Sequence, residues 1–304
     1  MNYRNEDCLT YLKQIDDKSI DLIVTDPPYY RVVKDRWDKQ WKTIDDYYEW
    51  CSSWIQELGR VAKYSCSFWL FGYPRNVTPL LPQIERAGFS FKQQIIVSKG
   101  LRAVAGRTKS TQRVFPTTTE SIFFFHYDAR DHITHLLETE RNRLNLKTVD
   151  MNTLLGLRTT GGGAYSAMVT SNKEKRSYPK RQHWERLSEV FNLPSYDDVV
   201  YKFNIPYGIT DVWDDINFYD RSIHKIHPTQ RPEKLIERII KTSSNPNDNV
   251  LDIFTGSGTT AVVCKQNERN FYGCEIDPEY YQESLTRVQL PDLVTMSKIT
   301  QDPV

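Results

Sequence analysis

The stretch LDIFTGSGTT, residues 251–260, joins an apolar run to two closely spaced glycines. This order predicts a strand that turns sharply into a helix, because Gly256 and Gly258 can adopt backbone conformations that other residues avoid. The next predicted strand, NFYGCEID, ends on Glu275. An acid that follows the glycines by about 20 residues is typical of nucleotide-binding βαβ units, in which the acid holds the ribose hydroxyls.

The glycine turn is incomplete as a phosphate-binding motif. It lacks the full GxGxxG pattern, and the chain contains no GxxxxGK[ST] loop. The turn therefore favours a ligand that carries a ribose but no phosphate. Taken alone, two glycines at this spacing more often form an ordinary strand-to-helix turn. The strand before them, the helix after them and the acid at the right distance favour a binding site.

A second strand-like stretch, IDLIVTDPPYY at residues 20–30, ends on a charge, two prolines and two aromatic rings. Pro27 and Pro28 have no backbone N–H, so this corner presents mainly acceptors, namely carbonyl groups and the Asp26 carboxylate. Tyr29 adds a flat aromatic face. These groups predict a site for a planar molecule with an NH2 group, such as a nucleobase. A double proline by itself more often marks a structural corner.

Strand and helix periodicities alternate around both motifs, which predicts an α/β fold with a mostly parallel, twisted sheet and helices on both faces. The elements predicted in residues 1–128 are strands at 20–26, 65–72, 91–100 and 121–128 and an amphipathic helix at 45–63. Residues 129–222 break the pattern and are interpreted as an inserted subdomain. Residues 223–290 restore it, with a helix that has Pro232 in its first turn. Residues 291–304 are expected to form a loose tail.

The composition indicates a globular protein, because 39% of the 304 residues are hydrophobic. No apolar run reaches the roughly 20 residues that a membrane helix needs, and the N-terminus has no apolar targeting segment. The five cysteines are scattered and form no CxxC motif. This usage is typical of a reduced, cytoplasmic protein.

The net charge of +1 predicts no polyanionic partner by itself, but the basic residues are unevenly distributed. Two basic stretches, at 98–119 and 172–186, either form solvated surface or bind phosphates. The candidate phosphate contacts are Lys99, Arg102, Arg107, Lys109, Arg113, Lys180 and Arg181. His132 and His135 have no cysteine or acid cluster nearby, so they are interpreted as surface histidines and no metal site is predicted.

The motifs together resemble those of the S-adenosylmethionine-dependent DNA amino-methyltransferases. DPPY at 26–29 is similar to the catalytic motif, DIFTGSGTT to the cofactor motif, and HPTQRPEKLIERII at 227–240 to a third motif at the methionine end of the cofactor. The run-up NEDCLTYLKQIDDKSIDLIVT also matches. The order, with the catalytic motif first, an insertion next and the cofactor motif last, resembles the permuted β group. In that group the insertion, here 129–222, recognises the target.

The resemblance implies a Rossmann-like methyltransferase fold, S-adenosylmethionine as cofactor and double-stranded DNA as partner. Asp26 and Pro28 would accept the hydrogens of the target amine, with Pro27 in the same corner, and Tyr29 would stack on a base flipped out of the helix. The positions that match the family's cofactor site are Asp7, Cys8, Asp26, His227, Thr229, Arg231, Asp252, Phe254, Gly256, Gly258, Thr259, Thr260 and Glu275. The family usually has Pro at Ile253 and Lys at Arg231; neither departure removes a needed charge or glycine.

Adenine N6 is the favoured target, because Asp at the first position of DPPY is more often associated with adenine and Ser with cytosine. Methylation of cytosine N4 is the nearest alternative. Enzymes that act on RNA or on protein glutamine use a related corner but usually place the cofactor motif first. A non-catalytic binding module would be expected to have lost Asp26, Tyr29 or a turn glycine. The absence of a Pro-Cys dipeptide argues against methylation of a cytosine ring carbon.

Several properties are left open by the sequence. The recognition sequence, a homodimer and a cognate restriction endonuclease are not determined. Tyr30 either lines the base pocket or covers the end of the sheet, and the second role is favoured.

Overall fold

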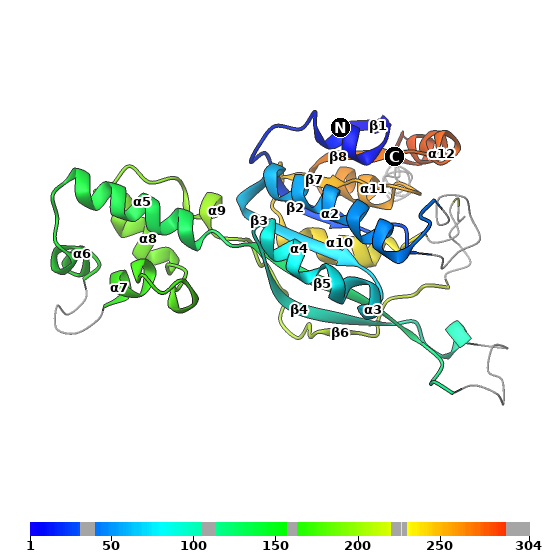
Figure 1. Cartoon of the computed structure of the whole chain (residues 1–304), viewed down its shortest axis with the longest axis horizontal. Helices are drawn as coiled ribbons and strands as arrows, with labels where there is room; N and C mark the ends of the chain where they lie inside the picture. Colours follow the sequence, from blue (N-terminus) through cyan, green and yellow to red (C-terminus); the bar gives the residue numbers. More distant parts are fainter. Residues whose placement is uncertain (31–39, 105–112, 157–162, 220–225, 227–229, 290–304) are drawn as a thin grey trace, which may run out of the picture.

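The computed structural model describes residues 1–30, 40–104, 113–156, 163–219, 226 and 230–289. Its centre is an eight-stranded sheet (Figure 1). In spatial order, the strands are β1 (Asn2–Asn5), β8 (Asn270–Glu275), β7 (Asn249–Asp252), β2 (Ile20–Thr25), β3 (Ala62–Phe71), β5 (Thr119–Tyr127), β4 (Phe89–Ser98) and β6 (Val212–Trp213). Only β5 is antiparallel to its neighbours, so the predicted mostly parallel α/β sheet is confirmed.

Helices flank this sheet and also form a separate group. Those that accompany the sheet are α1 (Cys8–Leu12), α2 (Ile44–Val61), α3 (Pro74–Val77), α4 (Leu81–Arg86), α10 (Glu233–Ser243), α11 (Thr259–Gln266) and α12 (Pro278–Gln289). The separate group contains α5 (Arg130–Arg143), α6 (Thr148–Leu154), α7 (Ala164–Val169), α8 (Arg181–Ser188) and α9 (Tyr196–Val199). Short 3-10 helices occupy Thr78–Leu80, Leu101–Val104 and Lys173–Lys175. Within the described residues, no helix combines the length and apolarity needed to span a bilayer.

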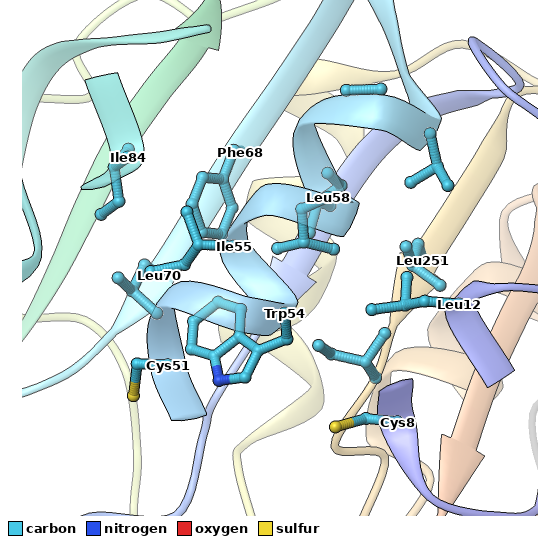
Figure 2. Close-up of a cluster of buried hydrophobic side chains, with 14 of the residues drawn as sticks. Cys8, Leu12, Cys51, Trp54, Ile55, Leu58, Phe68, Leu70, Ile84 and Leu251 are labelled. Carbon is cyan, nitrogen blue, oxygen red and sulfur yellow. The ribbon is translucent and has the colours of Figure 1, made fainter. Parts of the chain in front are cut away.

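Alternating side chains of the strands bury both faces of the sheet. On one face, Phe68 and Leu70 of β3 pack against α2, as Figure 2 shows around Trp54 and Leu58. On the other face, the alternate side chains of β3 pack in a second cluster with α10 and α11. Covering both faces is what a parallel sheet requires, because its strands are apolar on both sides.

The start of helix α2 is determined by local side-chain contacts. Thr43 and Asp46 form a capping box, in which the Asp46 N–H donates to the Thr43 hydroxyl at 3.1 Å and the Thr43 N–H donates to Asp46 at 2.9 Å. The helix therefore begins at Ile44, close to the predicted start at residue 45.

The helices α5–α9 form a lobe beside the sheet (Figure 1). They enclose their own hydrophobic cluster, which runs from Ala129 to Val200 and includes Leu137, Tyr165 and Trp184. The chain then returns to the sheet, where β6 pairs with β4 and Trp213 joins the core of the second face. The division at 129–222 stays a prediction.

The structure gives the direction of β5, which the predicted mostly parallel sheet left open. Strand–helix–strand repeats imply parallel neighbours, but β4 and β5 are joined by the segment 99–118, whose described part contains only a single 3-10 turn. Strand β5 lies antiparallel to both β4 and β3, a direct pairing that consecutive strands can form without a crossover. Strands β1 and β6, of four and two residues, were not predicted from the sequence.

Candidate active site

The two motif corners meet at the carboxyl ends of β2 and β7, which are adjacent parallel strands. From β2 the chain continues through α2 to β3 on one side, whereas from β7 it continues through α11 to β8 on the other. Adjacent strands whose crossovers leave in opposite directions form a topological switch point, where open α/β sheets bind ligands. The sheet therefore brings Asp26 and Asp252 to one site.

A cavity of about 390 Å³ lies at this switch point. Most of the described residues that the sequence assigned to the site line it. They are Asp7, Cys8, Asp26, Pro27, Pro28, Tyr29, Arg231, Asp252, Phe254, Gly256, Thr259, Thr260 and Glu275. His227 and Thr229 lie outside the described residues. One cavity thus connects the acceptor corner with the glycine turn.

The Asp26 carboxylate is held through both of its oxygens. The Tyr29 hydroxyl donates to Oδ1 at 2.6 Å, while Nε and Nη2 of Arg231 lie 2.8 and 2.7 Å from Oδ2. Burial and the neighbouring Asp26 charge raise the pKa of Tyr29 well above its usual value, so the phenol remains a donor. Asp26 is therefore a fixed acceptor with a cation on one side and a phenol on the other.

Arg231 joins Asp26 to a second carboxylate. Its Nη1 contacts Glu120, and its guanidinium lies over the Phe71 ring at 4.9 Å. The other oxygen of Glu120 accepts from Lys99 at 2.9 Å. Burial alone would raise the pKa of Glu120, but Arg231 and Lys99 hold it below its usual value. Lys99, Glu120, Arg231 and Asp26 thus form a chain of alternating charges.

Asp252, at the end of β7, has neutral donors instead. Its Oδ1 accepts the Phe254 N–H at 3.1 Å and its Oδ2 accepts the Thr260 hydroxyl at 2.6 Å. Among the described residues, no basic side chain forms an ion pair with Asp252. Burial raises the pKa of Asp252 to about 7. A buried carboxylate of this kind suits a ligand that brings a positive charge.

The glycine turn has the predicted left-handed conformations, with φ of +51° at Gly256 and +74° at Gly258. The two glycines nevertheless differ in position. Gly256 lines the cavity and donates its N–H to Glu275 at 2.8 Å. Gly258 does not line it, and a Cβ there would lie 2.9 Å from the Cβ of Ser284 in α12. The close approach at Gly258 is to a neighbouring helix.

Glu275, Asp7 and Cys8 come together on the β8 side of the cavity. The second oxygen of Glu275 accepts the Asp277 N–H at 2.9 Å, and burial raises the pKa of its carboxyl group. Asp7 accepts the N–H groups of the first turn of α1 and caps that helix. Burial raises the pKa of Cys8 to about 12, so it remains a thiol. This wall therefore offers two carboxylates beside apolar surface.

Aromatic side chains lie in the cavity wall and beside it, and the sequence analysis assigned neither Trp50 nor Tyr73 to the site. Trp50 of α2 lines the cavity and lies 5.6 Å from the Phe254 ring. Tyr73, just after β3, lies 5.5 Å from the ring of Tyr29. Trp50 falls within the amphipathic helix predicted at 45–63, and Tyr73 belongs to no motif. Tyr30 packs near Tyr47, at 6.1 Å between rings, outside the cavity lining.

The predicted DNA contacts fall at opposite ends of the molecule. Lys180 and Arg181 lie at the start of α8 in the helical lobe, whereas Arg102 lies on the connection between β4 and β5 (Figure 1). Arg181 pairs with Asp197 at 2.5 Å. Arg113 is exposed on the same connection as Arg102. Arg107 and Lys109 lie outside the described residues.

The predicted surface histidines lie in α5. The His132 ring stacks on Tyr64 at 3.6 Å between centroids. Across the described part of the chain, no three His, Cys, Asp or Glu side chains are grouped as metal ligands.

A doubly wound α/β sheet with a ligand cavity at its switch point is typical of nucleotide-binding enzymes. The family model N6_N4_Mtase, described as "DNA methylase", matches residues 20–286. The chain belongs to this DNA methylase family. Among the described elements, β1, α1 and the last residues of α12 lie outside this match.

Individual relatives are similar over nearly the whole chain. The Type II methyltransferase M1.MboII of Moraxella bovis is 28% identical over 91% of this chain and 92% of its own length. The DNA adenine methyltransferase YhdJ of Escherichia coli (strain K12) is 28% identical over 93% of this chain and 81% of its own length.

Solved structures share the fold. The M1.HpyAVI–SAM complex has a TM-score of 0.55 at 21% identity, with 94% of this chain and 98% of that chain covered. The cytosine-N4-specific PvuII DNA methyltransferase has a TM-score of 0.59 at 19% identity, with 99% and 90% covered. At these identities the likeness concerns the fold alone.

Proposed function

We propose that this DNA methylase transfers a methyl group from S-adenosylmethionine to the exocyclic N6 amine of an adenine flipped out of duplex DNA. The observation that carries the proposal is the single cavity that joins the Asp26–Tyr29 corner to the Asp252 and Glu275 carboxylates. Such a cavity allows a methyl donor and a planar amine to meet across one switch point.

The Asp26 corner is suited to an exocyclic amine. The lone pair of such an amine is delocalised into the base, so the nitrogen is a poor nucleophile. Hydrogen bonds from its two hydrogens to Asp26 and to a carbonyl of the Pro27–Pro28 corner favour a pyramidal nitrogen with a usable lone pair. Because the Tyr29 hydroxyl donates to Oδ1 at 2.6 Å, the amine has to replace this hydroxyl.

The Asp252 side of the cavity fits the cofactor. S-adenosylmethionine carries an ammonium and a sulfonium, and Asp252 is a buried carboxylate whose described partners are all neutral. Glu275 and Asp7 offer acceptors for hydroxyl and amino groups, and Trp50 and Phe254 offer apolar faces for an adenine ring. When bound, the cofactor would supply an electrophilic methyl group to the amine nitrogen held at Asp26: a C–N bond would form as the S–C bond breaks, the sulfur would leave as a thioether, and one amine proton would pass to solvent.

The same proposal assigns target recognition and the contacts with the DNA backbone. Residues 129–222 recognise the target sequence, as in the β group, with Lys180 and Arg181 as phosphate contacts. Arg102 and Arg113 contact the DNA backbone from the other end, with Lys99 at the root of this segment, and Arg107 and Lys109 remain candidate phosphate contacts outside the described residues. A homodimer, a cognate restriction endonuclease and a cytoplasmic location stay predictions.

Cytosine N4 is the second candidate target, because the family model is named for both amines. Two observations favour adenine: the corner begins with Asp26, and YhdJ, 28% identical, is named a DNA adenine methyltransferase.

Product analysis tests the proposal. Unmethylated duplex DNA is incubated with the protein and isotope-labelled S-adenosylmethionine, digested to nucleosides and separated by mass spectrometry. The expected product is labelled N6-methyldeoxyadenosine. Labelled N4-methyldeoxycytidine would assign the second candidate. Activity on RNA or protein but not on duplex DNA would contradict both.

A further inference from the structure

Glu120 belongs to no sequence motif, yet it contacts Arg231, which lines the cavity. It lies near the start of β5, opposite Val97 of β4, and only 18% of its side chain is exposed. One carboxylate oxygen accepts from Lys99 at 2.9 Å and the other contacts Nη1 of Arg231. A carboxylate this far out of water is costly unless it is paired, so its partners suggest its role.

The guanidinium of Arg231 uses its donors unequally. Nε and Nη2 both approach Oδ2 of Asp26, at 2.8 and 2.7 Å. An arginine that faces a carboxylate commonly binds both oxygens as a fork. Here Oδ1 of Asp26 accepts from the Tyr29 hydroxyl, and the remaining guanidinium nitrogen, Nη1, contacts Glu120. Glu120 therefore draws Arg231 to one side of Asp26.

We propose that Glu120 is a positioning residue for methyl transfer: it holds Arg231 on Oδ2 of Asp26 and so keeps Oδ1 for the target amine. The inference rests on the proposed function, because Oδ1 matters only if Asp26 accepts an amine. The formal charges of Lys99, Glu120, Arg231 and Asp26 cancel. Without the charge of Glu120, two cations face one carboxylate, and Arg231 is free to turn and bind both Asp26 oxygens.

Lys99 holds Glu120 from the other side. Its ammonium pairs with Glu120, and its backbone N–H donates to the Thr118 carbonyl at 2.8 Å, which closes the root of the β4–β5 connection. Glu120 is thus held between two cations, one of which, Lys99, is itself fixed through its backbone, so the Glu120 carboxylate limits how far Arg231 can turn.

The test is Glu120→Gln, which keeps the size of the side chain and removes its charge. The purified full chain is assayed for methyl transfer to duplex DNA, cofactor affinity by calorimetry and thermal melting. The expected result is a kcat about 10²-fold lower, the cost typical of a misplaced reacting group. KM for DNA and Kd for the cofactor should stay within about threefold, because interactions made only during reaction change kcat.

Two further variants separate positioning from folding. Glu120→Asp keeps the charge and should recover part of the lost kcat. Glu57→Gln is the matched control, because Glu57 also forms a partly buried ion pair, with Arg60 at 2.9 Å, but Arg60, unlike Arg231, lies outside the cavity lining. It should melt lower without losing kcat. If Glu120→Gln does not fold, Glu120→Met, an apolar side chain of similar length, carries the same expected loss of kcat.

Distinct outcomes overturn the inference and the proposed function. A folded Glu120→Gln or Glu120→Met variant with wild-type kcat overturns the role of Glu120. So does a loss confined to KM or cofactor Kd, or an equal loss in Glu120→Asp and Glu120→Gln. Failure of the wild-type protein to methylate DNA in the same assay contradicts the proposed function instead.

Discussion

The corners after β2 and β7 both present a carboxylate to the same cavity, but they stabilise it differently. Asp26 is paired with Arg231 and accepts the Tyr29 hydroxyl. Asp252 accepts from Phe254 and Thr260, both neutral, and burial raises its pKa to about 7. A carboxylate that already has a cation suits a neutral partner, such as a base amine. A carboxylate without one suits a cationic partner, such as the methionine end of the proposed cofactor.

The largest effect is expected at the first corner. Asp26→Ala removes the acceptor that makes the amine nucleophilic, so methyl transfer should fall by about 10³-fold or more. Cofactor affinity should change little, because Asp252 and Glu275 are untouched. Methyl incorporation and calorimetry measure the two quantities separately. Near wild-type transfer by a folded Asp26→Ala protein would contradict the proposed mechanism.

The second corner should show the opposite pattern. Asp252→Asn removes the charge but keeps the shape, and we expect the cofactor Kd to rise by about 10- to 100-fold, as for a lost charged hydrogen bond. At saturating cofactor, kcat should remain close to that of the wild type. Asp21→Asn is the matched control, because Asp21 is equally buried but pairs with Lys63 at the amino end of β2. If that variant weakens cofactor binding as much, the effect at Asp252 reflects stability.

Cofactor affinity should depend on pH through Asp252. Its pKa is raised to about 7, so the carboxyl group is largely neutral below pH 7 and becomes charged above it. A cationic ligand prefers the charged form, so affinity should fall as the pH falls through 7, by up to about tenfold per unit. Binding at pH 6 should also release a proton.

Calorimetry at pH 6, 7 and 8, in buffers of different ionisation enthalpy, measures both effects. Asp252→Asn cannot titrate and should give a nearly flat profile. A wild-type profile equally flat would show that Asp252 does not meet a positive charge.

The sequence was sufficient to predict both corners, because their signals are local. Strand periodicity followed by Pro27–Pro28 or by Gly256 marks a strand end, and a parallel sheet brings such ends to one edge. The switch-point arrangement of β2 and β7 is consistent with these predictions, and the mostly parallel sheet is confirmed.

The contacts between distant segments could not be predicted in this way. Glu120 and Arg231 are separated by 111 residues, and no periodicity relates them. Their meeting depends on β5 being antiparallel to β3, which the strand–helix rhythm did not indicate. Gly258 likewise fits a cofactor pattern in sequence, whereas its close neighbour in space is Ser284. Local motifs predict which groups face the cavity, while the partners of those groups depend on the completed sheet.

The smallest effect is expected from removing the Tyr29 hydroxyl. This change tests whether Asp26 acts by accepting the target amine or depends on its hydrogen bond with Tyr29. The hydroxyl occupies Oδ1 at 2.6 Å, where the amine is proposed to bind. Tyr29→Phe removes this competitor but keeps the ring for stacking, so kcat/KM for DNA should stay within about threefold of the wild type. Tyr29→Ala, the control, also removes the ring and should lower kcat/KM by about 10- to 100-fold, since base stacking on an aromatic ring contributes about 1–3 kcal/mol. An equal loss of kcat/KM in both variants would mean that the hydroxyl itself is needed. Asp26 would then present its acceptor to the base only while the Tyr29 hydroxyl donates to Asp26.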